Sequence, residues 1–132
     1  MKAAPRTFRY TQDHEWASFD LNVGRTVRVG ITEYAESQLG DIVYVDLPAV
    51  GTELRQHEAF GTVESVKSVS DLMSPVSGRV VAINDGLVDA PDAINKDAYG
   101  AGWIVEIEAS DSAELDALLT PDAYDTYVGG LG

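Results

Sequence analysis

Short runs of alternating apolar and polar residues, divided by turn residues, cover the first two thirds of this 132-residue sequence. In residues 26–31, Val27, Val29 and Ile31 occupy every second position, which is typical of a β-strand with one buried face. Similar β-branched or aromatic runs lie at residues 42–47, 60–66, 79–83 and 103–107. Breaker clusters separate these runs at residues 47–51, 74–78 and 84–86. Many short strands with frequent turns predict a mainly β protein, an antiparallel sandwich or barrel.

Two regions carry helix signals instead. Thr32 can cap a short helix that ends at Gly40. Acidic residues near the start of this helix interact favourably with the positive end of the helix dipole. Near the C-terminus, leucines recur at helical spacing, and Thr120 followed by Pro121 is a cap with proline at the first helical position. These patterns predict a helical hairpin over residues 112–129, packed against the β body. Residues 88–102 are expected to form a long surface loop.

Composition narrows the possible functions. The chain has 22 acidic and nine basic residues, a formal charge of −13, and such a field repels phosphate backbones. The absence of cysteine excludes disulfides and thiol chemistry of the chain itself. No apolar stretch approaches the ~18 residues of a membrane helix, and the first ten residues do not resemble a signal peptide. We expect one cytoplasmic domain over residues 1–132 that is monomeric and binds neither nucleic acid nor membranes.

The sequence assembles no autonomous catalytic site. The two histidines, His14 and His57, are far apart, and the His14-Glu15-Trp16 segment lacks the second histidine of a zincin motif. There is no Gly-x-Ser-x-Gly elbow, and Gly100-Ala-Gly102 is only half of a dinucleotide fingerprint. A non-catalytic protein is therefore predicted.

Residues 64–71 read Glu-Ser-Val-Lys-Ser-Val-Ser-Asp, almost the same in both directions. This pattern predicts a β-hairpin with Lys67 and Ser68 at a two-residue tip. The expected cross-strand pairs are Val66 with Val69, Ser65 with Ser70, and Glu64 with Asp71. Because like charges directly opposite each other are destabilising, the Glu64 and Asp71 carboxylates are expected to be splayed, solvated or available to a cation.

Lys67 is one of only three lysines and is isolated from other basic residues. A lysine at the tip of a rigid hairpin is accessible to a modifying enzyme, and a cofactor attached there would act as a swinging arm at high effective concentration. The geometry alone leaves biotin, lipoate and acetylation as alternatives.

Six segments in order resemble the glycine cleavage H-protein family, the lipoyl-carrying proteins of that system. They are YTQDHEW (10–16), VGITEYA (29–35), QLGDIV (38–43), ESVKSVSD (64–71), SPVSG (74–78) and YGAGW (99–103), and they span roughly residues 8–130. The resemblance implies a flattened antiparallel barrel-sandwich of the lipoyl/biotinyl type. It also implies a short helix after the third strand region and a C-terminal helical extension over residues 112–129.

The same resemblance implies roles for particular residues. Lys67 would carry lipoate as N6-lipoyllysine, and Glu64 and Gly78 would be recognised by the lipoate ligase or lipoyl transferase. A cleft that holds the loaded arm would include Glu15, Tyr34 and Asp71, because carboxylates favour the cationic aminomethyl group. Many relatives carry histidine at the position of Tyr34, where a tyrosine can wall the cleft but supplies no titratable imidazole.

The function implied is that of a shuttle. The lipoyl arm would take the aminomethyl group from a pyridoxal-phosphate glycine decarboxylase to a tetrahydrofolate-dependent aminomethyltransferase, and electrons to a dihydrolipoyl dehydrogenase. The alternative is an H-like relay that donates lipoate to other proteins. A lipoyl domain of a 2-oxoacid dehydrogenase would carry Asp-Lys-Ala at the tip, and a biotin carrier would flank its lysine with methionines. Two alternatives belong to other functional classes: an acidic interaction module without a cofactor, and a hydrolase.

Overall fold

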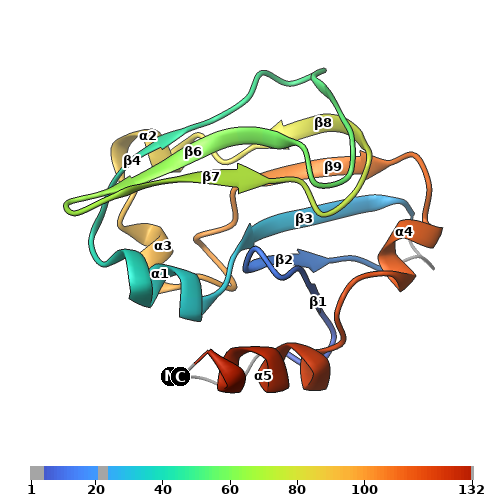
Figure 1. Ribbon diagram of the computed structural model, residues 1–132. Coiled ribbons are helices and arrows are strands. Elements are labelled where there is room, and N and C mark those ends of the chain that lie inside the picture. The colour runs from blue at the N-terminus through green and yellow to red at the C-terminus, as the bar shows by residue number, and fades with distance from the viewer. Residues whose placement is uncertain (1–4, 21–23, 132) are drawn as a thin grey trace.

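The computed structural model describes residues 5–20 and 24–131, which form two antiparallel sheets (Figure 1). The six-stranded sheet has the order β1-β2-β3-β9-β8-β5, and the three-stranded sheet has the order β4-β6-β7. The strands of the larger sheet are β1 (Arg9–Tyr10), β2 (Glu15–Ser18), β3 (Thr26–Ile31), β5 (Glu53–Leu54), β8 (Gly78–Ile83) and β9 (Val105–Ala109). Those of the smaller sheet are β4 (Ile42–Asp46), β6 (Ala59–Ser65) and β7 (Val69–Met73). The predicted mainly β fold, a flattened barrel-sandwich, is confirmed.

Apolar side chains from both sheets form the main core. Val27 and Val29 are fully buried on β3, as their period-two spacing predicts, and they belong to the same cluster as Val63 of β6, Leu72 of β7 and Ile107 of β9. Burying each such side chain contributes roughly 1.5–3 kcal/mol relative to leaving it exposed. The core therefore holds the β4-β6-β7 sheet, and with it the β6–β7 hairpin, in place against the larger sheet.

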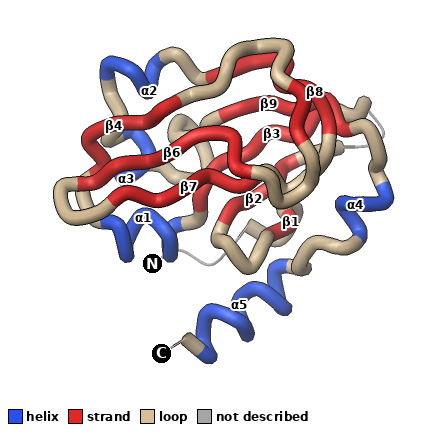
Figure 2. Tube along the Cα trace, turned by 45° about the horizontal axis from the view of Figure 1, so that its top comes forward, coloured by secondary structure: helices blue, strands red, loops and turns tan. Residues whose placement is uncertain are grey.

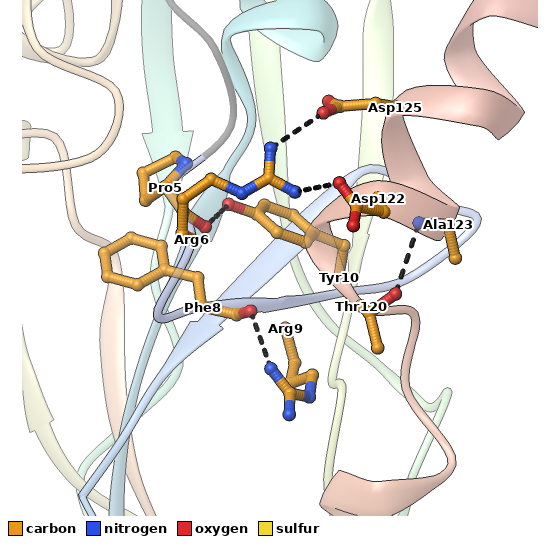
Figure 3. Close-up of polar contacts among 9 residues, drawn as sticks. All are labelled: Pro5, Arg6, Phe8, Arg9, Tyr10, Thr120, Asp122, Ala123 and Asp125. Carbon is orange, nitrogen blue, oxygen red and sulfur yellow. Dashed lines mark hydrogen bonds and ion pairs between the residues drawn. The ribbon is translucent and has the colours of Figure 1, made fainter.

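A second, aromatic cluster joins the N-terminal strands to the C-terminal helix α5 (Pro121–Gly130). Tyr10 stacks on Tyr124 with ring centroids 4.7 Å apart, and the Trp16 indole donates to the carbonyl of Ala98 at 2.9 Å. Arg6 pairs with Asp122 and Asp125 on α5, as Figure 3 shows. The aromatic contacts hold α5 against β1 and against the turn that precedes β2.

The predicted helices are present. Helix α1 (Glu33–Leu39) is capped by the Thr32 hydroxyl and ends at Gly40, whose φ of 83° favours glycine. At the C-terminus, α4 (Ala113–Asp116) and α5 are joined by residues 117–120, within which Leu119 exchanges two backbone hydrogen bonds with Tyr10.

The expected long loop over residues 88–102 is wrong in part. It contains α3 (Ala93–Lys96), and α2 (Gly86–Asp89) begins just before it. Each is a single turn anchored by one buried side chain, Leu87 and Ile94, so tertiary contact and not helical periodicity stabilises it. Within the described ranges, none of the helices has the length and apolar character needed to cross a bilayer.

Candidate functional site

The β6–β7 hairpin projects at one edge of the molecule beside α1, as Figures 1 and 2 both show. Its register differs from the expected one: Glu64 pairs with Val69 and Thr62 pairs with Asp71. The predicted apposition of Glu64 and Asp71 is therefore wrong, as are the predicted two-residue tip and its other pairs. The loop consists of residues 66–68, one residue more than a two-residue turn.

Ser65 explains the register. Its backbone N–H donates to the carbonyl of Ser68 at 2.8 Å, and its hydroxyl oxygen lies 3.3 Å from Lys67 N and 3.1 Å from Ser68 N. The side chain is buried and organises the loop, so it cannot face Ser70 across the strands. In addition, Val66 N donates to the carbonyl of Asp41 at 3.2 Å, which fastens the tip to the segment after α1. The loop that presents Lys67 is thus held in place from two sides.

Lys67 is exposed, and its ammonium makes no ion pair within residues 5–20 and 24–131. Its stem runs toward the C-terminal end of α1, because a Cβ built on Gly40 would lie 3.7 Å from Lys67 Cε. Asn95 of α3 supports this end, since its side chain donates to the Gly40 carbonyl at 2.8 Å and accepts from Ile42 N. A group attached to Lys67 therefore starts beside the last turn of α1.

A cavity of about 250 Å³ lies along α1 from this point. Its walls come from α1, from β7 and from the turn that precedes β2. They consist of Asp13, His14, Tyr34, Ala35, Gln38, Leu39 and Ser70. The cavity thus begins at Leu39, the residue before Gly40, and extends toward Tyr34 in the first turn of α1.

His14 is a cavity residue that the sequence reasoning passed over as a failed metal motif. Its ring packs on Tyr34 with centroids 4.7 Å apart, and its Nδ1 lies 2.9 Å from the Tyr124 hydroxyl oxygen. Burial lowers the pKa of the imidazole, against the opposing effect of the Asp13 charge, and so favours the neutral ring. Tyr34 lines the cavity, as expected, and supplies no imidazole. An imidazole is nevertheless present in the same wall, on His14. No local pattern marks this role, because it depends on contact with α1 and α5.

Glu15 is buried and is not among the residues that line the cavity. It is 2% exposed, and its two carboxylate oxygens accept from the Thr11 hydroxyl at 2.8 Å and from Met73 N at 3.3 Å. Burial raises the pKa of Glu15 to about 8, against the opposing effect of these hydrogen bonds. The carboxyl group therefore holds its proton over much of the neutral range.

Asp71 and Glu64 are both exposed. Successive residues of a strand point to opposite faces, and Ser70 lines the cavity, so the Asp71 side chain points away from it. Of the three residues expected in the arm cleft, the structure brings only Tyr34 to this cavity. Within the described residues, no group of three or more His, Asp or Glu side chains is placed to hold a metal ion.

Gly78 has a packing role of its own. It lies at the start of β8, and its φ is 157°. A Cβ at this position would collide with the backbone carbonyl of Glu108 on the neighbouring strand β9. Strand β7 leads from the 66–68 loop, which carries Lys67, to Met73, and Gly78 follows Met73 in the sequence. Lys67 and Gly78 are therefore at opposite ends of β7. The packing of β8 on β9 therefore requires glycine at position 78, whether or not a lipoylating enzyme contacts it.

Comparisons with known proteins extend over nearly the whole chain. The family model described as Glycine cleavage H-protein matches residues 8–129. Proteins named glycine cleavage system H protein from Carboxydothermus hydrogenoformans, Symbiobacterium thermophilum and Acidobacterium capsulatum are 46%, 51% and 52% identical. They align with 95%, 96% and 96% of this chain and 94%, 97% and 95% of their own. The crystal structure of the Mycobacterium marinum protein of that name is 41% identical, with a TM-score of 0.83 over 98% of this chain and 99% of its own.

Proposed function

The chain belongs to the glycine cleavage H-protein family, and on that premise we propose that it is a lipoyl-bearing carrier of a glycine cleavage system, with lipoate in amide linkage to Lys67. The observation that carries the proposal is the position of Lys67. It is exposed at the tip of a hairpin whose loop is fastened by Ser65 and by Asp41, and the end of its stem lies beside Gly40, next to the cavity residue Leu39. A rigid base and a mobile side chain are what a tethered carrier needs.

The protein's contribution is attachment, reach and protection, and the bound lipoyl group supplies the disulfide that accepts the aminomethyl group and electrons. The partners are a pyridoxal-phosphate glycine decarboxylase, a tetrahydrofolate-dependent aminomethyltransferase and a dihydrolipoyl dehydrogenase. The chain itself acts as a non-catalytic subunit. A monomeric state and a cytoplasmic location stay predictions from the sequence.

The residues fit this cofactor. The cavity beside Lys67 has two apolar side chains in its wall, Ala35 and Leu39, one turn apart on α1, and an alkyl arm would pack against them. Polar side chains line the rest of it. Glu64 is exposed one residue before the buried Ser65, close enough to the tip to contact an enzyme that modifies Lys67. Its recognition by the lipoylating enzyme, and that of Gly78, are part of the proposal, as is a role of Glu15, Tyr34 and Asp71 toward the arm.

A relay that donates lipoate to other proteins is not favoured, because the relatives near 50% identity are named for the glycine cleavage system. No feature of the hairpin or the cavity points to it either.

The test is lipoylation followed by transfer. The purified protein is incubated with a lipoate ligase, lipoate and ATP, and peptide mass spectrometry locates the added group. We expect one lipoyl group on Lys67, none in the Lys67→Arg variant, and an unchanged result in Lys96→Arg, whose lysine pairs with Asp92 instead. A label found only on Lys96, or on Lys2, which lies outside the described residues, would sink the proposal. The lipoylated protein should then accept label from glycine in the presence of the decarboxylase.

A further inference from the structure

One side chain, that of Asn95 in α3, contacts both residues that flank Asp41. Its amide nitrogen donates to the Gly40 carbonyl at 2.8 Å, and its amide oxygen accepts from Ile42 N at 2.9 Å. The Asp41 carbonyl between them accepts from Val66 N at 3.2 Å. A continuous series of contacts therefore runs from α3 to the tip of the β6–β7 hairpin.

Both hydrogens and the oxygen of the Asn95 amide have partners. The nitrogen that donates to Gly40 also donates to the Glu36 carboxylate at 3.2 Å. These partners fix the orientation of the amide, because the Gly40 carbonyl only accepts hydrogen bonds and Ile42 N only donates one. An aspartate at this position would offer acceptors alone, and an apolar side chain would offer neither. The three contacts together therefore require an amide.

Helix α3 holds Asn95 in this place. It lies beside α1, at the same edge of the molecule as the hairpin tip (Figures 1 and 2). The helix is a single turn, too short to be stable by itself, and its Ile94 side chain is fully buried in the main core. Burial of Ile94 thus fixes the backbone from which the next side chain reaches residues 40–42.

The Lys67 side chain rests on the same segment. A Cβ built on Gly40 would lie 3.7 Å from Lys67 Cε, so the stem of the lysine passes over the glycine whose carbonyl Asn95 holds. The backbone before the lysine is held by Asp41, the next residue along the chain. Residues 40–42 therefore contact the lysine from two directions, through its stem and through the start of its loop.

We propose that Asn95 is a positioning residue for the modification of Lys67: it fixes residues 40–42, and through them it orients the hairpin tip and the lysine stem toward the lipoylating enzyme. The inference rests on the proposed attachment of lipoate to Lys67. In that step the ligase converts lipoate and ATP to lipoyl-AMP and pyrophosphate. The neutral Lys67 amine then forms the amide, displaces AMP and loses a proton. Asn95 acts through Gly40 and Asp41 and needs no contact with the reacting atoms.

The experiment compares two asparagines that each hold two backbone carbonyls or amides. Asn95→Asp and Asn95→Ala are the test variants, and Asn84→Asp is the matched control. The Asn84 side chain donates to the carbonyls of Ala101 and Trp103 at 3.0 and 2.7 Å, away from residues 40–42 and from the hairpin tip. Amide hydrogen exchange is measured by NMR on the unlipoylated proteins. The kcat and KM of lipoylation are then measured with a lipoate ligase at saturating lipoate and ATP, with the protein as the varied substrate.

We expect both test variants to loosen the tip. Asn95→Asp places a carboxylate oxygen against the Gly40 carbonyl and the Glu36 carboxylate, whereas Asn95→Ala removes the contacts without adding charge. Exchange of the Val66 amide should accelerate by roughly three- to tenfold, as for the loss of one or two hydrogen bonds. The KM for the protein should rise by a similar factor at unchanged kcat, because only molecules with an oriented tip bind the enzyme productively. Asn84→Asp should change neither quantity.

Several results would overturn the inference. One is an unchanged Val66 exchange rate or an unchanged KM in the Asn95 variants, and Asn95→Ala decides this alone if Asn95→Asp does not fold. Another is an equal rise of KM in Asn84→Asp, since that would reflect general loosening of the fold. If Lys67 of the unmodified sequence accepts no lipoyl group, the proposed function fails and this inference fails with it. Normal lipoylation at an equal KM in all variants overturns the inference alone.

Discussion

The Nδ1 atom of His14 lies 2.9 Å from the hydroxyl oxygen of Tyr124, which connects the cavity wall to the C-terminal helix α5. The same hydroxyl lies 2.7 Å from the Oγ1 of Thr32, the residue that caps α1. One phenol group on α5 therefore contacts both the turn and the helix that form the cavity. The C-terminal extension takes part in the candidate site, although it lines none of the cavity itself.

Removal of this hydroxyl should loosen the cavity wall. Tyr124→Phe deletes a group that is buried and bonded to two partners, which leaves Thr32 and His14 with unmet hydrogen-bonding capacity. We expect the free energy of unfolding to fall by about 1–3 kcal/mol, measured by urea denaturation. Tyr127→Phe is the control, because within the described residues Tyr127 contacts His14 only through its ring. A loss as large in the control as in Tyr124→Phe would contradict the assignment.

Glu15 should make stability depend on pH. Its folded-state pKa of about 8 lies above the ordinary value of 4.5, so between these values the folded protein keeps a proton that the unfolded chain has lost. The contribution of Glu15 to the free energy of unfolding is fully present below about pH 4.5 and is lost as the pH rises toward 8. Glu15→Gln cannot ionise, so its free energy of unfolding relative to the parent should rise with pH, by on the order of a few kcal/mol from pH 5 to 8.

The pH dependence of that difference is the informative quantity. The glutamine amide changes the contacts with Thr11 and Met73 N, and this adds an offset that does not vary with pH. Denaturation curves at several pH values separate the two contributions. A difference that stays constant from pH 5 to 8 would mean that Glu15 ionises normally in the folded protein.

Gly78→Ala should destabilise the sheet. The added methyl group meets the Glu108 carbonyl, and strand β8 cannot keep its register with β9 without a backbone shift, at a cost of roughly 2 kcal/mol. Gly129→Ala, where no atom lies within 4 Å of the added Cβ, should instead be neutral or stabilising by up to about 1 kcal/mol. Thermal denaturation of both variants tests the contrast. The proposed recognition of Gly78 requires, in addition, slower lipoylation per folded molecule in Gly78→Ala but not in Gly129→Ala.

Ser65→Ala should free the tip of the hairpin. The hydroxyl is buried and accepts from the amides of Lys67 and Ser68, so its removal leaves both amides without their side-chain acceptor. We expect faster hydrogen exchange at these two amides, with about 1 kcal/mol lost in global stability. Ser70→Ala, on the exposed start of β7, is the control and should leave both amides unchanged. Equal exchange in the two variants would show that other contacts hold the loop.

Much of the fold could be predicted where the signal is local. Thr32 and Gly40 mark the two ends of α1, because a cap and a left-handed glycine act within one turn of the chain. The alternation in residues 26–31 identified β3 and its buried face for the same reason. In contrast, the single turns α2 and α3 were missed, since Leu87 and Ile94 stabilise them through contacts with distant parts of the chain.

The sequence by itself determined the antiparallel β architecture, the capped helices and the isolated lysine at a hairpin tip. The tertiary structure alone decided the register of that hairpin, because the Ser65 hydroxyl and the Asp41 carbonyl both bind the loop. It also decided which acidic side chain lines the cavity: Asp13 does, whereas Glu15 is buried and does not. Burial and orientation depend on residues brought together from β2, α1, β7 and α5, and no local pattern records those contacts.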